Sequence, residues 1–249
     1  MWKQHLHAVY KAEKTPYVGS LLSHVESLMT ENTTKSFDRF DLNELNRAIA
    51  EINTNKSYKR HHHWKYLQHS NHSAKACLIE VFKYWVGNVL QGRLYANWNL
   101  FLTNVSFIPK QGKKDFSSRK SWRQISMGTS KNWLLEKMLL YRVQPYLHTS
   151  DCQFGYKSGH STLHAIELVR VLERRYDAHV CLLDASSAFD KLSWNRIHDQ
   201  LQKRLVPVCL IKIIMTQLFS TKISVCGTAT IFPRTGVKQG GILSGILFS

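Results

Sequence analysis

Paired cysteines, long apolar runs and acidic residues are the features that this sequence lacks or has in small number. Its five cysteines never occur in a C-x-x-C spacing, which argues against a zinc site of that kind and a disulfide framework and favours a reducing compartment. No apolar run reaches the 18 residues typical of a membrane span, and no cationic start precedes an apolar block. The sequence therefore predicts neither a membrane span nor a secretory signal.

Acidic residues are outnumbered two to one, with 17 Asp and Glu against 34 Lys and Arg and a formal net charge of +17. Such an excess is typical of proteins that bind polyanions, so nucleic acid is the leading partner. A basic surface that serves only solubility is the alternative. Residues 1–150 carry 22 basic and 10 acidic residues, and residues 151–249 carry 12 and 7. This asymmetry predicts that a nucleic-acid-binding region precedes the catalytic residues along the chain.

Hydrophobic residues make up 43% of the chain and aromatic residues 11%, enough for a buried core. Helical periodicity predicts helices at residues 41–53, 74–91, 133–147, 161–176, 195–205 and after Pro207. Strands are predicted at residues 104–110 and 179–184, with a hairpin at residues 222–232. Residues 1–35 are interpreted as a connecting segment, and the basic residues 55–65 as a loop. Helices around a small sheet indicate the α+β class.

Two stretches carry the candidate chemistry. In CLLDASSAFDKLSW, residues 181–194, an apolar run ends in Asp184. A carboxylate at the tip of a strand can reach a cation, and magnesium prefers hard oxygen ligands, although a helix cap or turn former is an equally good interpretation of Asp184. In GVKQGGILS, residues 236–244, glycines precede a predicted helix, which lets the backbone and a side-chain amide approach a nucleotide closely.

Linked motifs over residues 37–249 resemble the reverse transcriptases of non-LTR (LINE-type) retrotransposons. LLDASSAFDKLSW resembles the first catalytic motif of that family, and GVKQGGILSGILF resembles its G-V-P-Q-G-x-x-L-S-P-x-L-F motif. Upstream, FIPKQGKKD with WRQIS, LLEKMLLYRVQPYL, and QFGYKSGHSTLHAI resemble its finger, K-x-x-E and Q-F-G-F segments, in the family's order. The resemblance implies the fingers and partial palm of a right-hand polymerase, with a small antiparallel sheet packed on helices.

The resemblance assigns roles to the two residues that frame the first motif. It implies that Asp184 is the catalytic residue and binds the catalytic magnesium ions (Mg²⁺). Phe189 is implied to lie under the incoming sugar as a steric gate, where its ring would collide with a 2′-hydroxyl. Ordinary core packing is the alternative interpretation of Phe189.

The same resemblance implies a nucleotide-binding set. Gln239 and the adjacent Gly240 would contact the incoming nucleotide, and Lys110 and Arg123 would neutralise its triphosphate; the planar, multi-donor head of arginine suits that role. The implied partners are an RNA template, a DNA primer and a dNTP, and the implied location is intracellular and nuclear. The implied division is a linker at residues 1–36, a fingers-like region at 37–150 and a partial palm at 151–249.

Several segments depart from the family pattern. Residues 58–63 replace a G-x-D-G-type turn, Arg123-Gln124-Ile125 replaces R-P-I, Trp133 replaces the lysine of K-x-x-E, Ser244-Gly245 replaces S-P, and Ala96-Asn97-Trp98 alters P-x-x-W. These changes remove rigid or turn-forming residues rather than catalytic groups, so they bear on folding more than on chemistry.

The Y-x-D-D motif that brings the family's further carboxylates is expected shortly after Ser249, outside this sequence. We therefore expect the chain to be a fragment or decayed copy that is inactive by itself. Two other hypotheses stay open: a non-enzymatic basic remnant that binds RNA or DNA, and a reverse transcriptase of the group II intron maturase type.

Overall fold

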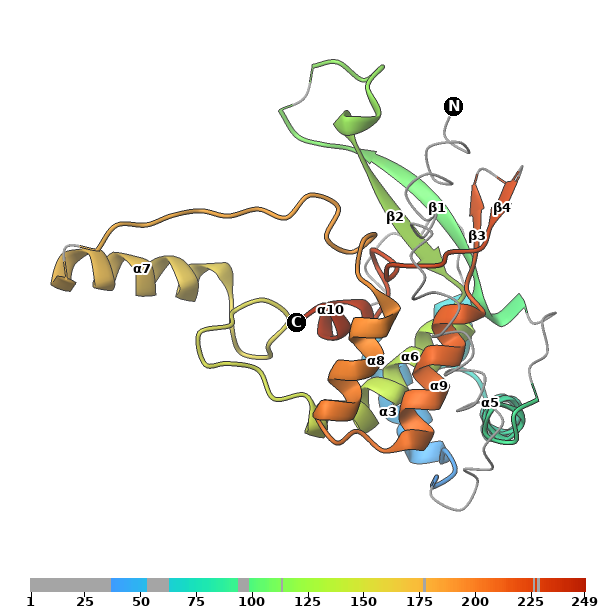
Figure 1. Cartoon of the computed structure of the whole chain (residues 1–249). Helices are drawn as coiled ribbons and strands as arrows, with labels where there is room; N and C mark the ends of the chain where they lie inside the picture. The colour runs from blue at the N-terminus through green and yellow to red at the C-terminus, as the bar shows by residue number, and fades with distance from the viewer. Residues whose placement is uncertain are drawn as a thin grey trace.

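The structure of the chain, a computed structural model, describes residues 37–52, 63–93 and 99–249, apart from residues 113, 177, 226 and 228 (Figure 1). The predicted connecting segment, most of the predicted basic loop and the altered P-x-x-W segment lie outside the described residues. In the part that is described, helices gather below a small sheet, and one long helix projects to the side.

Helix α3 spans Leu42–Ala50 and begins with a reciprocal cap. The carboxylate of Asp41 accepts a hydrogen bond from the Glu44 N–H (2.7 Å), and the Glu44 carboxylate accepts one from the Asp41 N–H (3.2 Å). This capping box satisfies two backbone donors that a helix start would otherwise leave open. The helix predicted over residues 41–53 is confirmed for Leu42–Ala50.

Helix α4 spans His63–Gln68 and corrects one prediction. Residues 63–65 form its first turn, so the loop predicted for residues 55–65 is wrong at that end. The basic composition suggested a loop, but Leu67 packs against the core and the Gln68 side chain donates to the Ile52 carbonyl (3.3 Å). Tertiary contacts thus override the local signal.

The remaining helices of the body share one core with α3. They are α5 (His72–Leu90), α6 (Ser130–Val143), α8 (Trp194–Lys203) and α9 (Val208–Phe219). Helix α9 runs through the middle, because ten of its residues are buried. Its buried Lys212 donates to the carbonyl of Leu90 at the C-terminal end of α5 (3.0 Å), where a positive charge opposes the helix dipole favourably.

In the described part of the chain, four strands form one sheet in the order β2-β1-β3-β4. Strand β1 (Leu102–Pro109) pairs antiparallel with β2 (Trp122–Gly128), and this hairpin rises above the helices (Figure 1). Strand β3 (Lys222–Val225) pairs antiparallel with β4 (Ala229–Ile231) but parallel with β1. The α+β class and the hairpin predicted at residues 222–232 are confirmed, whereas the sheet is mixed rather than purely antiparallel.

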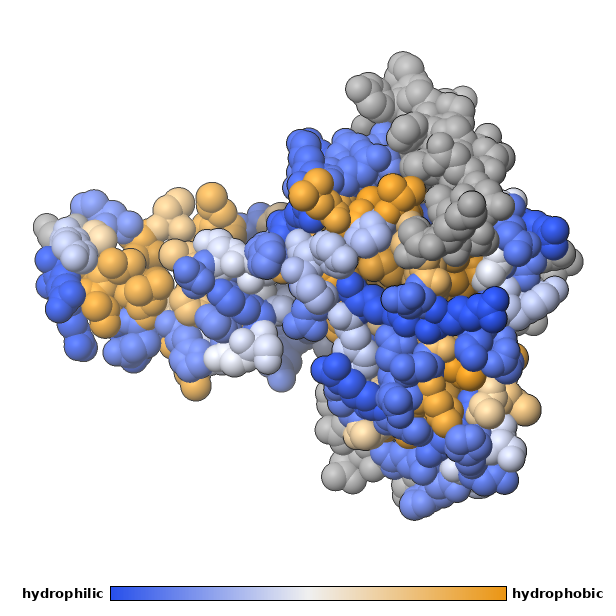
Figure 2. Space-filling view, turned by 90° about the horizontal axis from the view of Figure 1, so that it is seen from below, coloured by the Kyte–Doolittle hydropathy of each residue, from blue (hydrophilic) through white to orange (hydrophobic). Residues whose placement is uncertain are grey.

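Helix α7, Thr162–Tyr176, projects from the body, and none of its residues is buried. Apolar side chains lie along it in Figure 2. The large exposed ones are Leu163, Ile166, Leu168, Val171, Leu172 and Tyr176. The predicted helix is confirmed, but its apolar side packs on nothing in the described part of the chain. No described helix is both long and apolar enough to span a bilayer.

The segment that returns from α7 to the body corrects a second prediction. Residues 179–184 form no strand, and Leu182 and Leu183 are 91% and 93% exposed. An apolar run becomes a strand only when a neighbour completes its hydrogen-bond ladder. Among the described residues, no strand pairs with this run, so its apolar pattern alone does not produce the predicted strand.

Glu51 joins the end of α3 to α6. Its carboxylate contacts the Lys137 ammonium (2.6 Å) and accepts a hydrogen bond from the Tyr141 hydroxyl (2.8 Å). Burial raises the pKa of Glu51, but the hydrogen bonds from Lys137 and Tyr141 outweigh this effect and lower the pKa below its ordinary value of 4.5. The ionised form is therefore favoured in the folded state.

This lowered pKa predicts a stability loss in acid. The contribution of Glu51 should be fully present above its ordinary pKa of 4.5 and should disappear as the pH falls through the lower folded pKa. In urea unfolding followed between about pH 6 and pH 3, the Glu51→Gln variant should lose part of this pH dependence. Glu80→Gln, which removes the exposed partner of Lys83 within α5, is the control. Equal effects of the two substitutions would contradict the prediction.

Candidate nucleotide-binding site

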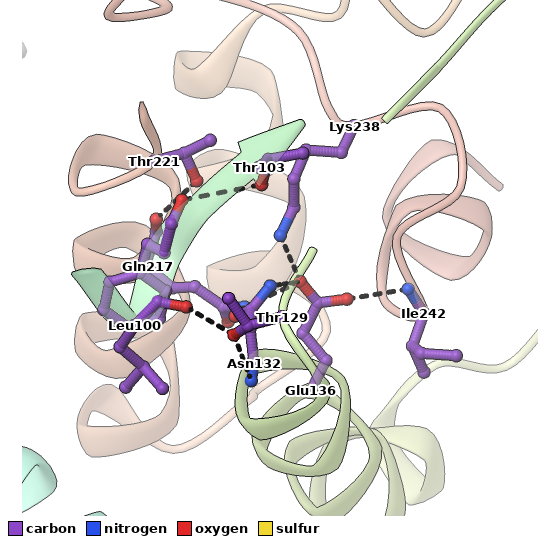
Figure 3. Close-up of polar contacts among 10 residues, drawn as sticks. Leu100, Thr103, Thr129, Asn132, Glu136, Gln217, Thr221, Lys238 and Ile242 are labelled. Carbon is purple, nitrogen blue, oxygen red and sulfur yellow. Dashed lines mark hydrogen bonds and ion pairs between the residues drawn. The ribbon is translucent and has the colours of Figure 1, made fainter. Parts of the chain in front are cut away.

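The site is organised around a carboxylate buried in helix α6. Glu136 is 3% exposed, and its Oε1 accepts hydrogen bonds from Asn132 Nδ2 (3.0 Å) and from Gln217 Nε2 (2.9 Å) of α9 (Figure 3). These donors replace the water that a carboxylate loses on burial. Helix α6 is itself fixed at its start, because the Thr129 hydroxyl accepts from the Asn132 N–H (3.2 Å) and donates to the Leu100 carbonyl (3.1 Å).

Two residues of the glycine-rich loop complete the contacts of this carboxylate. The buried Lys238 ammonium pairs with Oε1, and the Ile242 N–H donates to Oε2 (2.7 Å). Lys238 and Ile242 lie on either side of residues 239–241, as Figure 3 shows for the two ends. One carboxylate therefore fixes both ends of the segment that contains Gln239 and Gly240.

The middle of the loop is fixed to the hairpin of β1 and β2, here named the finger hairpin. The Ser126 N–H of β2 donates to the Gln239 carbonyl (2.8 Å). Gly240 has a φ of +112°, and a Cβ at this position would lie 2.9 Å from the Ser126 carbonyl oxygen. Only glycine accommodates both the backbone conformation and this approach. Gln239, which is half-buried, is therefore presented where the loop meets β2.

The loop that follows the first motif lies against the other side of this junction. The Phe189 carbonyl accepts from the Val237 N–H (2.8 Å), and the Gln124 side chain of β2 donates to the Asp190 carboxylate (3.0 Å). Gly236 has a φ of +81°, and a Cβ there would overlap the Asp190 carbonyl. The structure thus brings together β2, the loop at residues 186–192 and the glycine-rich loop.

The ring of Phe189 is half-buried between two other aromatic rings. It stacks on Phe248 of α10, Ser244–Phe248, at 5.1 Å between centroids and meets Tyr156 edge-on at 6.1 Å. A Cβ on Gly245 would overlap the Tyr156 ring. Glycine at position 245, where the family motif has proline, therefore makes room for the ring that contacts Phe189.

Lys110 and Arg123 lie on the same hairpin as Ser126. Lys110 follows β1, and its N–H donates to the Ser121 carbonyl (2.8 Å), which closes the loop between β1 and β2. Arg123 is exposed on β2, opposite Ile108 of β1. The hairpin thus carries both predicted triphosphate-binding residues and the contact to the Gln239 carbonyl.

Asp184 lies outside these contacts. Its side chain is exposed on the segment that returns from α7, and the hydrogen bonds that join the first motif to the other segments begin at Phe189. Among the described residues, no group of three His, Cys, Asp or Glu side chains could hold a metal ion. The catalytic role of Asp184 stays a prediction.

Sequence reasoning missed the pairing of Glu136 with Lys238. The signal was present: Trp133 stands where the K-x-x-E motif has lysine, and Lys238 stands where the glycine-rich motif has proline. The chain thus lacks a lysine three residues before Glu136 and has an additional lysine in the glycine-rich loop. This exchange suggests that Lys238 could pair with Glu136. Asn132 and Gln217 gave no comparable signal, because their contacts depend on how α6 and α9 pack.

The glycine-rich loop thus lies against both a strand of the β1–β2 hairpin and the aspartate-containing loop of the first motif. The reverse transcriptase (RNA-dependent DNA polymerase) family matches residues 108–249, more than half of the chain. The chain therefore belongs to the reverse transcriptase family.

Two relatives agree with this assignment. A probable RNA-directed DNA polymerase from transposon BS of Drosophila melanogaster is 27% identical over an alignment of 175 positions that covers 59% of this chain and 19% of the relative. A retrovirus-related Pol polyprotein from the type-1 retrotransposable element R2 of Popillia japonica is 28% identical over an alignment of 172 positions that covers 65% of this chain and 24% of the relative. The resemblance to non-LTR retrotransposon polymerases is confirmed, and the chain spans a quarter or less of these relatives.

The buried ion pair predicts a strong energetic coupling. Glu136→Gln should lower the unfolding free energy by about 3–5 kcal/mol, because it leaves the Lys238 charge buried without its partner. Adding Lys238→Met should recover part of this loss, with a coupling energy of about 1 kcal/mol or more in a double-mutant cycle. The exposed Glu80–Lys83 pair within α5 should show only about 0.3–0.5 kcal/mol. Additive effects at Glu136 and Lys238 would contradict the account.

The close approach at Gly236 predicts a second effect on stability. Gly236→Ala should destabilise the fold by about 1 kcal/mol or more, because the new Cβ meets the Asp190 backbone and strains a positive φ. In contrast, Gly87→Ala in α5, where a Cβ meets nothing within 4 Å, should stabilise by about 0.5–1 kcal/mol. Urea unfolding of both variants measures the difference, and a harmless Gly236→Ala would show that the two loops are not in contact.

Proposed function

We propose that this chain forms the fingers and the nucleotide-contacting part of the palm of an RNA-directed DNA polymerase from a non-LTR retrotransposon. Its partners are an RNA template, a DNA primer and a dNTP, in an intracellular, nuclear location where chromosomal DNA is accessible. One observation carries the proposal: the glycine-rich loop, which contains Gln239, is held in place by Glu136 and by strand β2. A loop held at both ends and in the middle can present one side-chain amide to a nucleotide with little loss of entropy.

Each nucleotide-binding residue has a role that its chemistry supports. Arg123 and Lys110 supply positive charge to the triphosphate, and Gln239 with the adjacent Gly240 backbone contacts the nucleotide. Phe189 is the steric gate. Its ring is held between Tyr156 and Phe248, so it forms a firm wall that would exclude a 2′-hydroxyl.

Reverse transcriptases as a family depend on a divalent metal. The described residues do not assemble a complete metal site, but magnesium usually takes only one or two protein carboxylates together with substrate phosphates. We propose Asp184 as the carboxylate that this chain contributes. When bound, the metal neutralises charge on the reacting phosphate.

A non-enzymatic nucleic-acid-binding protein is the second candidate. It is favoured by the net charge of +17 and by the exposed position of Asp184 apart from the loop contacts. Such a protein would bind RNA with an affinity that falls steeply with salt but ignores the identity of any nucleotide.

The two candidates differ in their response to a templated nucleotide. With a dideoxy-terminated DNA primer on an RNA template and with magnesium present, the dNTP complementary to the next template base should slow dissociation of the primer–template by about tenfold, or about 1.4 kcal/mol. Each mismatched dNTP should have no effect. Arg123→Gln should weaken the response, whereas Arg174→Gln on the projecting α7 should preserve it. Retention that is independent of dNTP identity would refute the polymerase role and support the second candidate.

A further inference from the structure

The loop at the tip of the β1–β2 hairpin, residues 110–121, is here named the finger loop. We propose that Phe116 in this loop is a stacking platform for an unpaired base of a single-stranded nucleic acid. The inference rests on the proposed function and adds to it a binding residue that lies outside the nucleotide-binding set. Four observations on the finger loop carry it: a fixed backbone, an exposed ring, surrounding positive charge and its position on the hairpin.

The backbone of the finger loop is fixed around Phe116. The Asp115 carboxylate accepts hydrogen bonds from the Ser117 N–H (2.9 Å) and from the Ser117 hydroxyl, which lower the pKa of Asp115 below its ordinary range. The Trp122 Nε1–H donates to the Phe116 carbonyl (2.9 Å). Phe116 is therefore held by its neighbours on both sides, and binding a ligand costs little further ordering.

The ring of Phe116 is exposed in spite of this fixed backbone. It is 48% exposed, and it meets the Trp122 ring edge-on at 5.7 Å and 63°. The contact with Trp122 covers only part of the ring, so a substantial part of the Phe116 side chain faces solvent. A firmly held aromatic surface of this kind is suited to stack on a base, and stacking of one base on an aromatic ring contributes about 1–3 kcal/mol.

The charge around the ring selects the ligand. Residues 110–123 contain six basic residues and one acidic residue, and Asp115, the acidic one, is engaged by Ser117. Lys114, Lys120 and Arg123 are exposed. Positive charge that follows a phosphate backbone, combined with an aromatic surface for its bases, is the recognition chemistry of single strands. An apolar protein or lipid partner would not match this charge.

The position of the finger loop fits a template strand. Ser126, which contacts the Gln239 carbonyl, lies four positions after Trp122 along β2. At about 3.3 Å per strand residue this is roughly 13 Å, the length of about four nucleotides at the duplex spacing of about 3.4 Å. A base stacked on Phe116 would thus lie a few nucleotides from the nucleotide site, where a template is still unpaired.

The proposal is tested by binding of an unstructured RNA of about 12 nucleotides, compared with an abasic ribose-phosphate strand of the same length. Phe116→Ala should weaken binding of the RNA about tenfold and leave binding of the abasic strand unchanged. Phe116→Trp should restore the affinity for RNA. Lys114→Gln should weaken both strands equally and reduce the salt dependence by about one counterion. Urea unfolding verifies that every variant folds.

Three outcomes would overturn the inference: equal loss for both strands, no loss for RNA, or no binding of either strand by the unaltered chain. The test is independent of the dNTP response. If the Phe116 effect holds but dNTP identity has no influence, the stacking site stands and the polymerase role falls. If dNTP identity matters but Phe116→Ala binds RNA normally, the inference alone falls.

Discussion

One buried carboxylate fixes the glycine-rich loop to the body of the protein. Glu136 receives donors from its own helix, from α9 and from both ends of the loop. Because a buried charge is tolerated only when it is paired and hydrogen-bonded, these partners depend on one another. The position of Gln239 is thus a consequence of how α6 and α9 pack, not of the loop sequence alone.

The same junction links the loop to the finger hairpin. Ser126 of β2 contacts the Gln239 carbonyl. Gln124, two residues before Ser126 on the same strand, contacts Asp190. Strand β2 therefore touches both motifs, and Arg123 together with the basic residues of the adjoining finger loop lies toward the tip of the hairpin. A hairpin anchored at one end and charged at the other can hold a nucleic acid and a nucleotide in a defined relation.

Much of the fold could be predicted from the sequence, because helices are local. The spacing of Leu45 and Ile49 and the cap of Asp41 sufficed for α3, and comparable patterns sufficed for α5 to α9. The strand ending at Asp184 failed because a strand depends on a partner that the apolar pattern does not specify.

The site could be predicted only in part. Backbone contacts bring together the loops that carry Phe189, Gln239 and Gly240. The glycines of the motif indicate such close backbone contacts. The pairing of Glu136 with Lys238 joins residues 102 positions apart, so only the packing of the helices reveals it. The role of Gly245 follows from the ring of Tyr156, which no local pattern indicates.

The most direct test of the central claim is amide hydrogen exchange at Ile242 and Ser126 in the Glu136→Gln variant. If Glu136 holds the loop, exchange at both amides should accelerate by about tenfold or more beyond the general acceleration that the lower stability of the variant causes at amides within α5. Unchanged protection at Ile242 and Ser126 would show that the loop keeps its position without the carboxylate, and would contradict the account.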